Sequence, residues 1–122
     1  MPDPGPHTRR FGPDARIGSR QDFRRVFTDG RKSVGRHLIL WCAPPLAAQS
    51  PRLGLSVPAK VGGAVQRNRL KRLVRESFRL NRDRLEPGDF VVYLRPGCRW
   101  GGLAEAQKDF LDLAGKARAL RP

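Results

Sequence analysis

The sequence is poor in cysteine and has no long apolar run. Its 122 residues include two cysteines, Cys42 and Cys98, too few for a disulfide framework and without CxxC spacing. No stretch reaches the ~20 apolar residues of a membrane-spanning helix, and residues 1–16 contain no apolar run of the signal-peptide type. We therefore expect a cytoplasmic protein with reduced thiols and no membrane partner.

Acidic residues are also scarce. Only 11 Asp and Glu oppose 25 Lys and Arg, which gives a formal net charge of +14 and a pI near 11.5. Such a surplus repels itself in a compact domain unless a polyanion neutralises it. Twenty of the 25 cations are Arg, which grips phosphate with a planar fork and stacks on bases, so a nucleic-acid partner is favoured. A GC-rich genome could explain the Arg-to-Lys ratio, but it does not explain the net charge.

Groups typical of protein catalysis are few. The two histidines, His7 and His37, stand apart from each other and from the cysteines, and no spacing typical of metal ligands occurs. Asp109 and Asp112 can share a helix face, but they stand among solvent-type residues. This composition argues against a nuclease whose own side chains perform the reaction.

The pattern of apolar and turn residues predicts a single α+β domain. After a Pro- and Gly-rich arm at residues 1–15, one domain is expected over residues 16–120. A capping box at Ser19 and Asp22 begins a short helix that Gly30 ends, and further helices are expected at 64–85 and 103–120. Strands are expected at 34–43, 52–57 and 90–95. Two or three strands are expected before the long helix, and the expected fold is an α/β sandwich in the order α-β-β-β-α-β-α.

The helix expected at 64–85 has one apolar and one cationic face. With ~100° per residue and Arg67 at zero, Lys71, Arg75 and Asn68 lie at about 40°, 80° and 100°. Nine basic residues lie between Lys60 and Arg84, against only two acids, Glu76 and Asp83. A solvated face would interleave the signs to gain i,i+4 pairs, and here Arg72 with Glu76 is the one well-placed pair. The face is therefore predicted to bind RNA phosphates.

The strand and helix around residue 60 resemble a known family. The run Gly54-Leu55-Ser56-Val57, then Lys60, then Ala64-Val65-Gln66-Arg67-Asn68-Arg69-Leu70-Lys71-Arg72, resembles the signature of the bacterial ribonuclease P protein subunit. The resemblance extends upstream to Asp22, Phe23 and Phe27 and downstream to the 90–95 strand, and covers roughly residues 16–118.

Membership of that family would imply a role, a cofactor and partners. The chain would be the non-catalytic protein subunit of an endoribonuclease that removes the 5′ leader from precursor tRNA. The catalytic RNA subunit would carry out the hydrolysis with Mg²⁺, which it would mainly bind itself. The implied partners are that RNA and the single-stranded leader, with no obligate protein partner. The family fold also has a left-handed β-α-β crossover, an exception to the usual handedness.

The resemblance implies two RNA-binding sites. A cleft between the first helix and the sheet would hold the leader, with stacking worth ~1–3 kcal/mol per base, although core packing is the alternative role for either phenylalanine. The residues implied for this cleft are Phe23, Phe27, Trp41, Arg36 and Ser56. Those implied for docking on the catalytic RNA are Arg67, Asn68, Arg69, Lys71, Arg72, Arg75 and Lys60, of which Lys60 could also meet leader phosphates.

Departures from the family pattern leave the central motif intact. Gly63 stands where Asn is usual as a helix N-cap, a change that costs only a few tenths of a kcal/mol. Pro58-Ala59 replaces a Ser-Lys pair, which removes one basic group beside Lys60. The alternative function is another basic RNA-binding module, such as a ribosomal protein, because charge and amphipathicity alone do not distinguish RNA partners.

Overall fold

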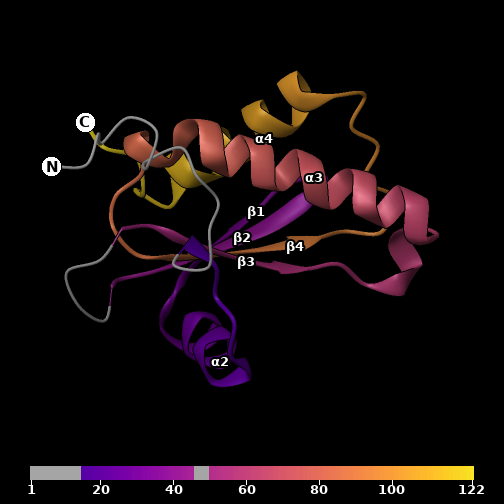
Figure 1. The fold of residues 1–122 in the computed structure, drawn as a ribbon. Helices are drawn as coiled ribbons and strands as arrows, with labels where there is room; N and C mark the ends of the chain where they lie inside the picture. Colours follow the sequence, from indigo (N-terminus) through magenta and orange to yellow (C-terminus); the bar gives the residue numbers. More distant parts are fainter. Residues whose placement is uncertain (1–14, 46–49) are drawn as a thin grey trace, which may run out of the picture.

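The computed structural model describes residues 15–45 and 50–122, which form three main helices and one four-stranded sheet (Figure 1). Their order is the predicted α-β-β-β-α-β-α. Most of the predicted arm, residues 1–14, lies outside the described residues. The elements are α2 (Arg20–Asp29), β1 (Arg31–Val34), β2 (Leu38–Ala43), β3 (Arg52–Ser56), the 3₁₀ turn η2 (Ala59–Val61), α3 (Ala64–Asn81), the 3₁₀ turn η3 (Arg82–Arg84), β4 (Asp89–Leu94) and α4 (Leu103–Lys116).

The sheet has the strand order β1-β2-β4-β3. β2 pairs antiparallel with β1 and with β4, whereas β3 and β4 are parallel. β2 is thus an inner strand, as its two apolar faces predicted. The parallel strands β3 and β4 are joined through α3, which makes a strand–helix–strand unit. The left-handed crossover expected for this unit stays a prediction.

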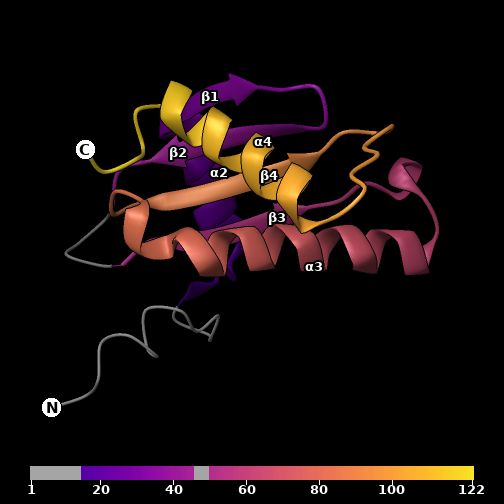
Figure 2. The same ribbon diagram turned by 90° about the horizontal axis from the view of Figure 1, so that it is seen from above.

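Helices cover both faces of the sheet. In Figures 1 and 2, α3 and α4 lie together on one face and α2 lies alone on the other. The larger core lies under α3 and α4, where Phe78, Phe90 and Phe110 pack together with ring centroids 6.1–6.4 Å apart. A smaller core under α2 joins Ile17 and Val26 to the sheet. Within the described part of the chain, no helix is long and apolar enough to cross a membrane.

Several boundaries differ from the sequence prediction. The strand expected at 34–43 is the β1–β2 hairpin, which closes where the Gly35 N–H donates to the Leu38 carbonyl over 2.9 Å. The helix expected at 64–85 is regular only to Asn81, because buried Arg82 turns inward and its Nε donates to the Pro51 carbonyl. The helix expected at 103–120 ends at Lys116, and Arg118 follows in the left-handed region at φ 58°.

The two outer strands, β3 and β1, differ in what lies along their open edges. The Ile17 N–H donates to the Leu53 carbonyl over 3.0 Å, and Arg16 forms a parallel bridge with Leu53, so this segment lies along β3. β1 has four residues, of which Arg31 and Lys32 are exposed. Among the described residues, β3 thus has a neighbouring segment along its open edge, whereas no strand pairs with the open edge of β1.

Candidate RNA-binding surfaces

The outward face of α3 carries the predicted cationic stripe. The helix buries Leu70, Val74 and Phe78 toward the sheet. The opposite side therefore faces solvent, and there Arg72 and Arg75 are exposed. Four cations of this stripe have no carboxylate of the described residues within ion-pair distance. These cations are Arg67, Lys71, Arg72 and Arg75.

The start of α3 adds backbone donors to this stripe. Gly63 is the N-cap, and no side chain in the described part of the chain caps the first N–H groups of the helix. Asn68 is exposed in the second turn, and Lys60 is exposed in η2, just before the helix. A helix N-terminus with nearby cations is electrostatically suited to phosphate.

Two arginines of α3 are engaged within the protein. Arg79 pairs with Glu76, with its Nε donating to Oε2 over 3.1 Å, so the predicted partnership of Arg72 with Glu76 was wrong. Hydrogen bonding from Arg79 holds the pKa of Glu76 below its ordinary value. The Arg69 guanidinium donates to the main-chain carbonyls of Trp100 and Gly101 over 3.1 and 3.0 Å. Arg69 is thus the one residue of the Arg67-Asn68-Arg69 motif whose side chain binds the chain's own backbone.

The opposite face of the sheet gathers three aromatic side chains that the sequence analysis grouped together. The Phe27 ring meets Trp41 edge-on, with centroids 4.8 Å apart, and lies 6.5 Å from the Phe23 ring. Phe27 is 43% exposed, whereas Phe23 and Trp41 are half-buried. We call Phe23, Phe27 and Trp41 the aromatic cluster. Its mixture of buried and exposed ring surface allows both packing and stacking on a base.

Phe23 fills the space that the small residues of β3 leave open. The sequence analysis found a face of β3 without bulk, at Gly54 and Ser56. A Cβ on Gly54 would lie 2.7 Å from the Phe23 ring, so only glycine permits this approach of α2. The space beside Gly54 is therefore filled by Phe23 of α2. Core packing, the alternative role for one phenylalanine, applies to Phe23.

Two neighbours of the aromatic cluster were missed by sequence reasoning. Tyr93 pairs with Ser56 and with Ile39 across the sheet, which puts it on the same face as Trp41. The alternation in β4, with Phe90, Val92 and Leu94 in the core, could have revealed it. Lys32 Nζ lies 5.7 Å from the centre of the Trp41 ring, a cation–π contact that required knowledge of the β1–β2 hairpin.

Arg36 lies on the other side of the sheet from the aromatic cluster. It lines a small hollow of about 160 Å³ together with Leu38 of the larger core and Leu113 and Lys116 of α4. The structure therefore does not bring Arg36 together with Phe27 and Trp41. Ser56, in contrast, is half-buried and shares their face through its pairing with Tyr93.

A buried carboxylate fastens α2 to the end of the sheet. Asp89 is 0% exposed and accepts hydrogen bonds from Arg25 Nη2 at 2.5 Å and from Arg52 Nε and Nη2 at 2.8 and 2.7 Å. Burial alone would raise the pKa of Asp89, but the hydrogen bonds from Arg52 and Arg25 outweigh it, and the pKa is lowered. Asp22 of α2 lies 3.8 Å from Arg52 and extends the group. The backbone N–H of Asp22 also donates to the Ser19 hydroxyl at 3.0 Å, which confirms Ser19 as the predicted N-cap of α2.

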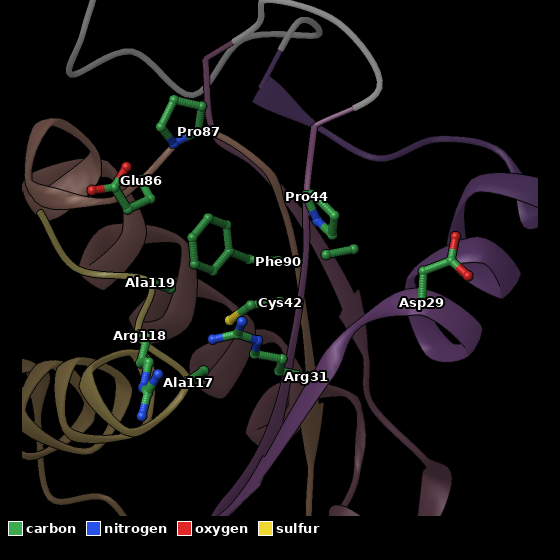
Figure 3. A pocket seen from close by; sticks show the side chains of 11 residues that line it. Asp29, Arg31, Cys42, Pro44, Glu86, Pro87, Phe90, Ala117, Arg118 and Ala119 are labelled. Atoms are coloured by element: carbon green, nitrogen blue, oxygen red, sulfur yellow. The ribbon is translucent and has the colours of Figure 1, made fainter.

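A larger cavity of about 400 Å³ lies where β2 ends, near the chain's C-terminal segment (Figure 3). Cys42 and Arg31, neighbours across the β1–β2 pair, lie on its wall. Burial raises the pKa of the Cys42 thiol to about 12, although Arg31 lowers it, so the sulfur is a poor nucleophile at neutral pH. None of the residues predicted to bind RNA lines this cavity.

Metal ligands do not gather in the described ranges, 15–45 and 50–122. No three His, Cys, Asp or Glu side chains there are placed so that they could hold one ion together. Asp109 accepts a hydrogen bond from Trp100 Nε1, and Asp112 pairs with Lys108, so each has a structural partner.

Comparison with protein families gives one match that spans most of the chain. The family described as Ribonuclease P matches residues 11–118. A ribonuclease P protein component from Azotobacter vinelandii is 47% identical over 117 residues, which cover 94% of this chain and 89% of the relative. Its counterpart from Clostridium acetobutylicum is 37% identical over 105 residues, which cover 82% of this chain and 88% of the relative.

Solved structures give the same result. The ribonuclease P protein of Staphylococcus aureus superimposes with a TM-score of 0.80 at 26% identity, covering 88% of this chain and 98% of that one. The ribonuclease P protein of Thermotoga maritima gives a TM-score of 0.73 at 30% identity, covering 83% of this chain and 96% of that one.

Proposed function

Because this chain belongs to the ribonuclease P protein family and is the protein component of an RNA-processing nuclease, we propose a division of labour within that nuclease. The RNA subunit carries out the hydrolysis that releases the 5′ leader of precursor tRNA. The protein holds the RNA subunit on α3 and the leader on the opposite face of the sheet. The assembly works in the cytoplasm, where precursor tRNA is available.

The outward face of α3 is the surface proposed to dock on the catalytic RNA. What supports this is a row of cations that have no acidic partner among the described residues, at the start of a helix whose N-cap, Gly63, provides no side-chain cap. Unpaired like charges at i,i+4 spacing cost a few tenths of a kcal/mol each in the free protein. An RNA backbone would neutralise them and release its counterions. Arg67, Asn68, Lys71, Arg72, Arg75 and Lys60 are the residues proposed to make these contacts.

The aromatic cluster is the surface proposed to hold the single-stranded leader. Its support is the exposed ring of Phe27 beside Trp41, with Lys32 above Trp41 as a partner for a phosphate. Stacking tolerates any base, so leaders of different sequence could be held in the same way. Ser56 and Tyr93 supply hydroxyl groups on the same face.

The chemistry is assigned to the RNA subunit with Mg²⁺ as its cofactor. Support comes from the described part of this chain, in which no group of metal ligands occurs and the carboxylates of Asp109 and Asp112 are hydrogen-bonded to Trp100 and Lys108. Most of the functional Mg²⁺ would be held by RNA phosphates. The role of the protein is then to lower the electrostatic cost of bringing two RNA chains together.

Reconstitution tests this proposal. The purified protein alone should not cleave precursor tRNA at any Mg²⁺ concentration. Added to its RNA partner at low Mg²⁺, it should restore cleavage at the 5′ end of the mature sequence. Cleavage by RNA-free protein would overturn the assignment of the chemistry. Failure to stimulate the catalytic RNA, together with tight binding to ribosomal RNA, would favour another RNA-binding module.

A further inference from the structure

We propose that Arg69 is a positioning residue: it fastens the loop between β4 and α4 to α3, and it supports docking on the catalytic RNA through that loop rather than by touching RNA. The part of this inference that concerns docking on RNA rests on the proposed function. The attachment of the loop to α3 is a property of the free protein, and it can be measured without RNA.

The geometry at Arg69 uses both arms of the guanidinium. One terminal nitrogen donates to the Trp100 carbonyl at 3.1 Å and the other donates to the Gly101 carbonyl at 3.0 Å. Two consecutive carbonyls in one loop thus match the planar fork of an arginine, which an ammonium group cannot reproduce. Two of the five N–H groups are used in this way, so the guanidinium is already fixed against the loop in the free protein.

The same loop is also held from α4. Trp100 is 3% exposed, and its indole Nε1 donates to Asp109 at 2.7 Å. The Gly101 N–H donates to Glu105 Oε2 at 3.2 Å. We call the hydrogen bonds that Arg69, Glu105 and Asp109 make with Trp100 and Gly101 the latch. Among these hydrogen bonds Arg69 is the only contribution from α3, and the other two side chains come from α4.

The position of the latch links it to the RNA-binding face. Arg69 lies in the second turn of α3, between the proposed phosphate contacts Asn68 and Lys71 in the sequence. In Figure 2 the β4–α4 connection comes down to the start of α4 beside this part of α3. Releasing the loop would loosen the contact between α3 and α4, on the side of α3 that lies opposite the cationic stripe.

A charge-conserving substitution separates the two possible roles of Arg69. Arg69→Lys keeps the positive charge but loses the fork, whereas Arg69→Ala loses both. In a Trp41→Phe background Trp100 is the sole tryptophan and reports on the loop. We expect both substitutions to shift Trp100 emission to longer wavelength and to increase its quenching by acrylamide. The matched control, Arg72→Ala, should leave Trp100 emission unchanged.

RNA affinity is then measured as a function of salt with Trp41 intact. Both Arg69 variants should bind the catalytic RNA about tenfold more weakly, because the loop must then be ordered on binding, at a cost on the scale of one charged hydrogen bond. Their log–log salt slope should stay close to that of the parent. Arg72→Ala should reduce the magnitude of the slope by about 0.7–0.9, the value of one phosphate contact.

Two results would overturn the proposal. The first is unchanged Trp100 emission combined with a reduced salt slope in Arg69→Ala and normal affinity in Arg69→Lys, which would make Arg69 a phosphate contact. The second is altered Trp100 emission with parental RNA affinity, which would make the latch irrelevant to docking. If the parent protein itself fails to bind the RNA, the proposed function fails, while the Trp100 measurement still decides the latch.

A measurement on the unaltered protein covers the case in which the Arg69 variants do not fold. An arginine-selective reagent followed by mass spectrometry should label Arg72 quickly in the free protein and slowly in the RNA complex. Arg69 should be labelled slowly in both. Fast labelling of Arg69 that RNA suppresses would overturn the positioning role.

Discussion

At the scale of single residues, Trp41 combines two environments. One part of its ring packs edge-on against Phe27 and the other lies below Lys32. A half-buried ring of this kind is held in place before any ligand arrives, so little side-chain entropy remains to be lost when a base stacks on the neighbouring surface. The position is therefore suited to binding without a conformational change.

Trp41→Ala is expected to weaken binding of leader-bearing precursor tRNA by ~1–3 kcal/mol, the value of one stacked base. Mature tRNA, which has no leader, should bind to the holoenzyme as before. Equilibrium binding of both RNAs to the reconstituted holoenzyme checks this prediction. The control, Trp41→Phe, keeps a flat ring and should retain most of the affinity. Equal losses for the two RNAs would show that Trp41 serves only the core.

Residue roles were predictable from the sequence to different degrees. The exposed cations of α3 followed from helical periodicity. The same arithmetic puts Arg69 about 200° from Arg67, off the cationic stripe and toward Leu73, so its separate role was available in the pattern. Its carbonyl partners were not, because Trp100 and Gly101 lie in a loop more than 30 residues away in sequence. The position of Lys32 beside Trp41 likewise required the strand register, whereas the alternation in β4 could have revealed Tyr93.

At the scale of elements, the attachment of α2 depends on charge as well as on apolar packing. Its buried surface is small, with Val26 the one fully buried residue of the helix. Arg25 of α2 forms an ion pair with Asp89 of β4, and Asp22 of α2 lies 3.8 Å from Arg52 of β3, which also pairs with Asp89. These ion pairs attach the helix to β3 and β4 at one end of the sheet. The same helix carries Phe23 and Phe27, so the ion pairs around Asp89 help to determine where the aromatic cluster lies over the sheet.

Asp89→Asn is expected to reduce the free energy of unfolding at pH 7 by about 2 kcal/mol or more, because two arginines lose a buried charged acceptor. The folded-state pKa of Asp89 is lowered, so its contribution is complete above the unfolded-state pKa of about 4 and is lost as the pH falls below it. The difference between parent and variant should therefore shrink between about pH 5 and pH 2. Urea unfolding over this range measures it.

A matched control for Asp89 is Asp112→Asn. Asp112 pairs with Lys108 on the exposed side of α4, where solvent screens the interaction, so unfolding should be unchanged. A parent–variant difference at Asp89 that stays constant down to pH 2 would contradict the ionic basis of the attachment.

Element types were predictable from the sequence, but their ends were less so. Periodicity gave all three helices, and Ser19 and Gly30 gave the limits of α2. The end of α3 was missed because the apolar pattern continues to Leu85, while the chain turns at Arg82 to reach the Pro51 carbonyl. The β1–β2 hairpin was missed in detail because Arg31 and Lys32 of the outer strand lack apolar alternation.

At the scale of the whole molecule, the sheet separates the two proposed RNA-binding surfaces. The cationic stripe of α3 lies above one face and the aromatic cluster lies on the other. A four-stranded layer with a packed core on each face lies between them, so we expect substitutions on one side to leave side chains on the other unaltered. Docking on the catalytic RNA and holding of the leader should therefore be separable.

Combining Arg72→Ala with Trp41→Ala tests this separation. Arg72→Ala should weaken binding to the catalytic RNA and, once the holoenzyme is saturated with protein, leave its preference for leader-bearing over mature tRNA unchanged. Trp41→Ala should do the reverse. In the double variant each free-energy change should equal that of the single variant within about 0.5 kcal/mol. A larger coupling would show that the two faces communicate.

The outer strands of the sheet have a consequence for self-association. An open strand edge presents unpaired N–H and C=O groups on which a second copy of the chain could add its own strand. β3 is shielded by the segment at Ile17, whereas β1 is short and carries the exposed cations Arg31 and Lys32. Two copies approaching through β1 would bring like charges together. The positive surplus that attracts RNA thus also keeps the free protein apart from its own copies, and strong salt would weaken both effects at once.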